Sequence, residues 1–77
     1  MIHELKTLPP YYEAVLRGNK MFEVRKNDRN YQVGDLLHLK EWNGIEYTGR
    51  NVRRKVTYIV TGGKFGIEDG YVIMSIV

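Results

Sequence analysis

The chain has 77 residues, no cysteine and two histidines, which leaves no material for a disulfide, a thiolate metal centre or a clustered metal site, so we expect neither a metal nor a cofactor. Its formal net charge of +3 is mildly basic and does not by itself indicate a nucleic-acid-binding protein. No apolar run approaches the ~20 residues of a membrane span, and the first residues lack the order of a signal peptide, so we predict a single cytoplasmic domain over residues 1–77.

The first part of the chain is predicted to form a strand and a helix. Residues 2–6 have the pattern of a short strand, and the helix starts within residues 7–10, because proline is tolerated in a first turn where its missing N–H costs nothing. Residues 11–17 continue the helix, and Gly18 suits the left-handed conformation that ends it. One apolar stripe at helical spacing predicts the face that packs on the core: Leu8, Tyr12, Val15 and Leu16.

A strand predicted over residues 21–26 carries the most informative pattern in the chain. Phe22 and Val24 alternate with Glu23 and Arg25, which predicts a buried apolar face and a charged face in water. The charges in and around this strand are Lys20, Glu23, Arg25, Lys26 and Asp28. They form either a solvated ion-pair ladder, which contributes little energy, or a binding face. In the second case the carboxylate stays ionised among cations, and Lys and Arg donate hydrogen bonds to an anionic or carbonyl-bearing ligand.

Strands are predicted over most of the remaining chain. A third strand covers residues 36–42, and Asn43-Gly44 predicts a tight type I′ hairpin turn that leads to a fourth around residues 45–48. The chain is completed by a long strand at 51–60, an irregular loop at 62–70 and a final strand at 71–77. One helix after the first of about six strands predicts a mainly β (α+β) fold, a small antiparallel β-barrel whose closure protects the edge strands.

A second basic cluster follows the hairpin and contains Arg50, Arg53, Arg54 and Lys55. If it meets the cations around Lys20 in the fold, the two clusters make a basic face suited to phosphates. Five aromatic residues are interleaved with the cations: Tyr31, Trp42, Tyr47, Tyr58 and Tyr71. Tyr31 and Tyr47 lie in turn regions and are surface candidates for stacking on bases, whereas most of the five are predicted to pack in the core. The glycine-rich run at residues 62–66 lacks the spacing and the following helix of a phosphate-binding loop, so we interpret it as a wide turn.

Taken in order, the motifs resemble a known family over essentially the whole chain. The first part of the match is the Pro-started helix ending in Leu16-Arg17-Gly18-Asn19-Lys20, then Phe22-Glu23-Val24-Arg25-Lys26-Asn27-Asp28, then Gln32-Val33-Gly34-Asp35. The second part is Glu41-Trp42, Tyr47-Thr48-Gly49-Arg50, the strand from Arg53 to Tyr58, and the glycine-rich loop through Tyr71-Val72. The chain thus resembles the small ASCH domains of the PUA-like superfamily, and among them the phage and bacterial set described as DUF3850.

This resemblance implies a PUA-like β-barrel with the helix beside a cleft, and a role in binding RNA or a nucleotide-like ligand. In ASCH domains a Gly-x-Lys…Arg segment lines the cleft, which here selects Lys20, Glu23 and Arg25. A related branch hydrolyses N4-acetylcytidine with a Lys, a Thr three residues later and a distant Glu. Lys20 matches that pattern, but Glu23 stands at the Thr position, and Glu68 is a candidate for the distant Glu only by its order in the chain.

We therefore hypothesise a non-enzymatic RNA-binding or nucleotide-binding module that uses a basic cleft between the helix and the barrel. The expected phosphate contacts are Lys20, Arg25, Lys26, Arg53, Arg54 and Lys55, while Glu23 orients Arg25 or accepts from a base amino group. The alternative is a small amidohydrolase acting on acetylated cytidine-type nucleosides, with Lys20 as base or nucleophile and Glu23 as proton shuttle. A third hypothesis is a phage protein-interaction domain acting on a host factor, for which the sequence has no feature of its own.

Overall fold

One short helix and five strands make up the computed structural model, which describes all of residues 1–77. In chain order they are β1 (Ile2–Thr7), α1 (Pro9–Leu16), β2 (Phe22–Lys26), β3 (Leu36–Trp42), β4 (Tyr47–Thr61) and β5 (Tyr71–Ile76). The predicted mainly β fold with one helix after the first strand is confirmed. This helix has eight residues, and no helix of the structure has the length and apolar character needed to cross a membrane.

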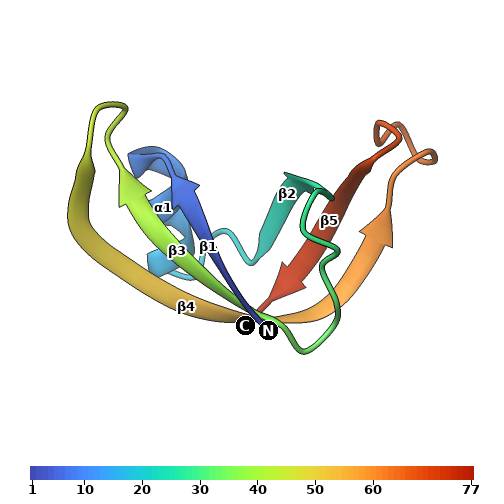
Figure 1. Cartoon of the computed structure of the whole chain (residues 1–77), viewed down its shortest axis with the longest axis horizontal. Helices are drawn as coiled ribbons and strands as arrows, with labels where there is room; N and C mark the ends of the chain where they lie inside the picture. Colours follow the sequence, from blue (N-terminus) through green and yellow to red (C-terminus); the bar gives the residue numbers. More distant parts are fainter.

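The five strands form one sheet in the order β1-β3-β4-β5-β2, and the sheet is not closed. The first half of β4 pairs with β3 and the second half pairs with β5, so the sheet bends along β4 into two halves (Figure 1). The prediction of a closed antiparallel barrel is not met, because no ladder joins the free edges β1 and β2, and β1 pairs with β3 in parallel. A parallel pair needs a long crossover between its strands, and here α1 and β2 lie within that crossover.

The two strands predicted on either side of Gly49 form a single strand, so the sheet has five strands rather than six. Trp42 pairs with Tyr47 and Lys40 pairs with Asn51. Between these two pairs β4 therefore contains more residues than β3 does. A bulge around Gly49, whose φ is 95°, absorbs the extra residues without ending the strand. Gly49, which resembles a turn signal in the sequence, therefore lies within the ladder between β3 and β4.

The hairpin predicted at Asn43-Gly44 is confirmed in place but not in type. Gly44 has a φ of 100°, whereas Asn43 is not among the residues with positive φ, and a type I′ turn requires positive φ at both. Instead, Oδ1 of Asn43 accepts hydrogen bonds from the N–H groups of Ile45 and Glu46, each at 2.9 Å. The asparagine side chain therefore shapes the turn, and only Gly44 has to adopt the left-handed conformation.

The hydrophobic core lies between the bent sheet and α1. Odd-numbered side chains of β1 and β3 point inward, as do even-numbered side chains of β5. The cluster that they form with neighbouring elements contains Leu5, Val15, Tyr31, Leu37, Leu39, Val56, Val72, Met74 and Ile76. Of the predicted helical stripe, Tyr12 and Val15 are buried, whereas Leu8 and Leu16 are exposed. The helix therefore packs with a narrower face than its sequence predicts.

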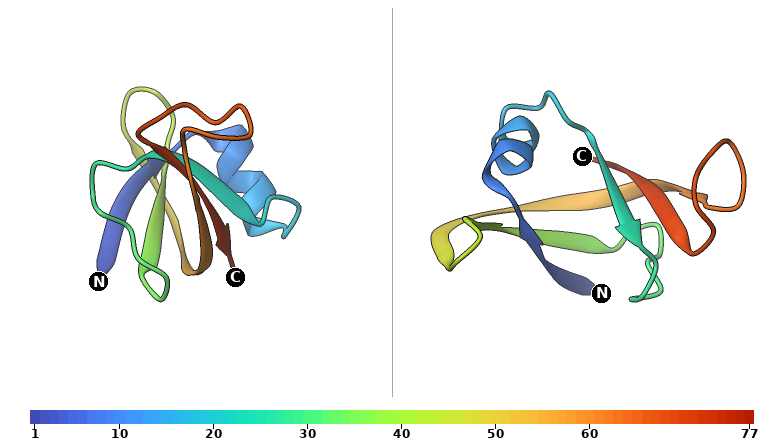
Figure 2. Two further views of the ribbon diagram at one scale, coloured as in Figure 1. Left: turned by 90° about the vertical axis from the view of Figure 1, so that its right-hand side faces the viewer. Right: turned by 90° about the horizontal axis from the view of Figure 1, so that it is seen from above.

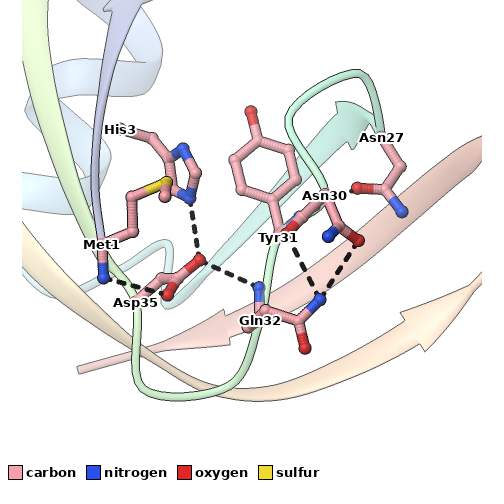
Figure 3. A network of polar contacts seen from close by, with 7 residues as sticks. All are labelled: Met1, His3, Asn27, Asn30, Tyr31, Gln32 and Asp35. Carbon is pink, nitrogen blue, oxygen red and sulfur yellow. Dashed lines mark hydrogen bonds and ion pairs between the residues drawn. The ribbon is translucent and has the colours of Figure 1, made fainter.

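Asp35 ties the start of β1 to the connector that leads into β3 (Figure 3). Its Oδ2 accepts hydrogen bonds from Nε2 of His3 at 2.8 Å and from the N–H of Gln32 at 3.0 Å. The hydrogen bond from His3 is the main cause that lowers the pKa of Asp35 below its usual value. Tyr31, predicted as a surface aromatic residue, is 5% exposed, and its ring meets that of His3 edge-on. The prediction is wrong because the side chains of Asn27 and Asp35 accept hydrogen bonds from the backbone N–H groups of Tyr31 and Gln32 and hold this connector against the core.

Candidate ligand-binding cleft

A cleft of about 530 Å³ opens where the end of β1, the start of α1 and β2 come together. The chain passes from β1 into α1 and then crosses to β2, so both free edges of the sheet reach this place (Figure 2). The lining residues are Lys6, Thr7, Leu8, Tyr11, Lys20, Phe22, Glu23, Val24 and Arg25. The three residues selected by the family resemblance, Lys20, Glu23 and Arg25, thus lie in one cleft beside the helix.

Glu23 is the buried charge of this cleft, with 2% of its surface exposed. Its Oε2 accepts a hydrogen bond from Nζ of Lys20 at 2.5 Å, and its Oε1 accepts from Nε and Nη2 of Arg25 at 3.0 and 2.9 Å. The Lys20 and Arg25 side chains are themselves partly exposed. A buried carboxylate is tolerated when its charge is compensated, and here two cations that still reach solvent compensate it.

The orientation of β2 is the reverse of the one its sequence predicts. Glu23 points inward, while Phe22 and Val24 are 45% and 51% exposed. The reason is the register with β5, where Glu23 lies opposite Met74, whose side chain is buried. Directly paired residues share a face of the sheet, so Glu23 and Arg25 are on the concave side, whereas Lys26 is on the other face with Phe22 and Val24. A period of two residues cannot identify the inner face of a strand when that face borders a charged cleft.

Arg25 connects the two free edges of the sheet. Besides its contacts with Glu23, its Nη2 donates to the carbonyl oxygen of Lys6 at 3.2 Å and to Oγ1 of Thr7 at 3.4 Å. The guanidinium group therefore joins β1 and β2 at a place where no backbone ladder does. Nη1 of Arg25 has no partner in the protein, which leaves two N–H donors of the group for a ligand.

The free edge of β2 adds backbone groups to the cleft. The carbonyl oxygen of Met21 accepts from Ile76, and the N–H of Asn27 donates to Gly70, so the odd-numbered residues of this segment bond to β5. In an antiparallel pair the intervening residues direct their N–H and C=O groups the other way. The carbonyl oxygen of Phe22 accepts from Nζ of Lys20 at 2.7 Å. The N–H and C=O groups of Val24 are therefore left as a donor and an acceptor on the cleft wall.

A smaller depression of about 180 Å³ adjoins the cleft at Arg25, which borders both. Its other lining residues are Leu5, Lys26, Asp28, Arg29 and Tyr31. Lys26, a predicted contact residue, lies here and not in the main cleft. Three cations and one carboxylate surround this depression, so its net charge is positive.

The second basic cluster lies away from the cleft. Arg54 faces α1, and its Nη2 lies 3.5 Å from the carbonyl oxygen of Val15. Arg53 and Lys55 are exposed and have no ion-pair partner, and none of the three residues lines either depression. The fold therefore does not bring the two predicted basic clusters into one cleft, because alternate residues of β4 point to opposite faces of the sheet.

Arg50, the remaining member of that cluster, fixes the helix to the sheet. Its Nη2 donates to Oε2 of Glu13 at 2.8 Å, and its Nε lies 3.8 Å from the buried carboxylate of Glu41. The hydrogen bond from Arg50, followed by that from Arg17, lowers the pKa of Glu13, and the same contact with Glu13 raises the pKa of Arg50. The ion pairs hold α1 in place and therefore position the helical wall of the cleft.

Six residues of the cleft were not predicted as site residues: Lys6, Thr7, Leu8, Tyr11, Phe22 and Val24. Phe22 and Val24 were predicted to be the buried face of their strand, and the other four come from the junction of β1 and α1, whose sequence indicates only where the helix begins. Thr7 is buried, while Leu8 and Tyr11 are large apolar side chains exposed at the mouth. The sequence offered one signal for the residues of this junction. The family resemblance implied that the helix lies beside a cleft, but this identified the helix and not particular residues on it.

The residues named for amide hydrolysis are arranged as follows. At position 23 the carboxylate is fully engaged with two cations and offers no hydroxyl nucleophile. Nζ of Lys20 is held by Glu23 and by the carbonyl oxygen of Phe22, the two groups to which it donates hydrogen bonds. Glu68 lies in the loop before β5 and does not line the cleft.

Comparison with known proteins gives two matches. A family model described as "Domain of unknown function (DUF3850)" matches residues 2–76. An "Uncharacterized 12.9 kDa protein in GpA 3'region" of Escherichia phage P2 is 48% identical over 73 residues, which cover 95% of this chain and 65% of that protein. The chain therefore spans slightly less than two thirds of the length of this relative.

Proposed function

The chain belongs to the DUF3850 family, and we propose that it is an RNA-binding module whose cleft takes one nucleotide of a single strand. The observation that carries this proposal is the buried Glu23, held between two partly exposed cations inside a cleft with apolar walls. Such a carboxylate is costly to bury and contributes no apolar packing. Its presence is best explained by a requirement to hold Lys20 and Arg25 in fixed positions for a ligand.

The dimensions and the walls of the cleft support a nucleotide as the occupant. Small-molecule sites are typically 300–1,000 Å³, mostly apolar, and carry a few placed polar groups, and this cleft of about 530 Å³ has that character. Leu8, Tyr11 and Phe22 are exposed apolar side chains on which a base would pack. The backbone N–H and C=O of Val24 offer a donor and an acceptor for a base edge. Single-stranded RNA is recognised by this combination of stacking and base-edge hydrogen bonds.

The smaller depression supports a polymeric ligand over a free base. Arg25 borders both hollows, so a nucleotide in the main cleft would place a neighbouring phosphate close to Lys26 and Arg29. Asp28 is the one carboxylate there and disfavours an anion, but three cations outweigh it. As part of the same proposal we assign the fold to the ASCH/PUA-like class, supported by the helix beside the cleft and by the Arg25 bridge between the open edges.

A salt titration tests the proposed function. A labelled random-sequence single-stranded RNA should bind at low salt with a log–log slope of roughly −2 to −4, because three to five phosphate contacts contribute about 0.7 each. Fluorescence anisotropy measures both affinity and slope. Lys26→Gln should make the slope less steep by about 0.7, while Lys64→Gln, an exposed lysine that lines neither hollow, should leave it unchanged. Absence of binding at low salt, or binding that does not respond to salt, would contradict the proposal.

A further inference from the structure

The outer face of the β1-β3-β4 half-sheet carries cations in register. Because β1 and β3 bury their odd-numbered residues, their even-numbered residues point away from the core together with the β4 residues paired to them. The paired rows on this face are Lys6, Lys40 and Asn51; then Glu4, His38 and Arg53; then Ile2, Leu36 and Lys55. The face thus holds four permanent cations and one carboxylate, so it is positive overall. We call these three rows the outer basic face.

Two aromatic side chains lie next to the first row. Trp42 and Tyr47 are paired in register, with ring centroids 5.0 Å apart and edge-to-face geometry. Nζ of Lys6 lies 4.0 Å from the centroid of the Trp42 ring, and Nζ of Lys40 lies 4.7 Å from that of the Tyr47 ring. Each aromatic ring therefore has an ammonium group against it.

These cation–π contacts are weaker than the contacts that a nucleic acid offers in exchange. An exposed cation–π contact contributes less free energy than the stacking of a base on an aromatic side chain does. When a strand arrives, each lysine can leave its ring for a phosphate, and a base can take the vacated ring. The exchange keeps the ammonium group paired and adds stacking, so it is favourable on both counts.

We propose that the outer basic face is a second contact surface for single-stranded RNA, with the phosphates along Lys6, Lys40, Arg53 and Lys55 and one base on the Trp42–Tyr47 pair. Lys6 links this surface to the cleft, because it lines the cleft while its ammonium group lies over Trp42. A strand with one nucleotide in the cleft can therefore continue around the edge of β1 onto this face. This inference rests on the proposed function, since it takes the same strand as the ligand of both sites.

The only tryptophan of the chain, Trp42, reports on this surface directly. Titration with an unlabelled random-sequence single-stranded RNA should quench the emission of Trp42. The RNA should also bind at least tenfold more tightly than a ribonucleoside 5′-monophosphate, which is too small to extend from the cleft to the outer basic face. The double variant Arg53→Gln/Lys55→Gln should weaken binding of the RNA about tenfold, make its salt slope less steep by about 1.4, and leave monophosphate binding unchanged. Lys64→Gln is the matched control on an exposed lysine outside the face.

A variant that binds RNA more tightly provides a second test, because a variant that fails to fold cannot show a gain of affinity. Glu4 is the one carboxylate of the face, is highly exposed and lies 3.5 Å from Nζ of Lys40. Glu4→Gln should tighten RNA binding two- to threefold, because it removes repulsion and frees Lys40. An RNA that binds without quenching Trp42, or a double variant that binds RNA like the unmodified protein, would overturn the inference. If the proposal for the cleft is wrong, the result is different, because ribonucleoside 5′-monophosphates then do not bind to the protein.

Discussion

Replacing Glu23 with glutamine is expected to lower the free energy of unfolding by about 2 kcal/mol and to weaken nucleotide binding about tenfold. Breaking a fully buried ion pair costs about 3–5 kcal/mol. The estimate here is smaller because Lys20 and Arg25 remain partly hydrated and glutamine keeps one acceptor oxygen. In a chain of this size the stability loss corresponds to a decrease in Tm of roughly 8–16 °C. Binding suffers because the two cations are no longer held in their positions.

Thermal melts and titrations with ribonucleoside 5′-monophosphates measure the two effects in parallel. Glu46→Gln provides a matched control, because the Glu46 side chain is exposed and makes no ion pair, and it should change stability by less than ~0.5 kcal/mol. In the double variant Lys20→Gln/Glu23→Gln the loss should be smaller than the sum of the two single losses, since the carboxylate and the ammonium group depend on each other. A Glu23→Gln variant that melts and binds as the Glu46→Gln control does would remove Glu23 from the site.

Gly62→Ala is expected to destabilise the fold by about 3 kcal/mol, at the upper end of the usual cost of overpacking. A Cβ atom at this position would overlap the carbonyl oxygen of Glu68 and would lie 2.8 Å from that of Tyr71. Both obstacles are backbone atoms, one in the loop before β5 and one in the first residue of β5. The N–H of Gly62 already donates a hydrogen bond to the carbonyl oxygen of Tyr71 at 2.7 Å. The clash cannot be relieved by rotating a side chain.

Gly66→Ala separates steric exclusion from backbone strain in the same loop. Gly66 has a φ of 78°, but a Cβ atom there would meet nothing within 4 Å. Only the cost of placing alanine in a left-handed conformation applies, roughly 1–2 kcal/mol. Urea denaturation of both variants measures the difference. Equal losses, or a larger loss for Gly66→Ala, would contradict the packing described for Gly62.

Local signals in the sequence predicted most of the elements. Leu36–Trp42 was predicted with both of its bounds, and the helix was predicted between its proline start and Gly18. Strand pairing was harder to predict, because the choice between a closed barrel and an open sheet depends on whether the backbones of β1 and β2 form a ladder. They do not, and the side chain of Arg25 joins the two strands instead, which no periodicity in the sequence reveals.

The candidate site was predictable as a set of residues but not as a geometry. The family resemblance selected Lys20, Glu23 and Arg25, and the structure places them in contact. The alternation of apolar and charged residues along β2 predicted the wrong inner face. It placed the apolar side chains inside, whereas the register with β5 turns Glu23 inward. The basic cluster on β4 divided between two faces for a related reason: consecutive residues of one strand cannot share a surface.

The central claim, that the cleft between α1 and β2 binds a nucleotide, is tested most directly by an amide ¹H–¹⁵N NMR titration with ribonucleoside 5′-monophosphates. The largest shift changes should fall on Thr7, Tyr11 and Val24, which line the cleft from β1, α1 and β2. The Val24 amide should move most, since its N–H faces the ligand. Shifts confined to the loop at residues 62–70, or no shifts for any of the four nucleotides at millimolar concentration, would contradict the account.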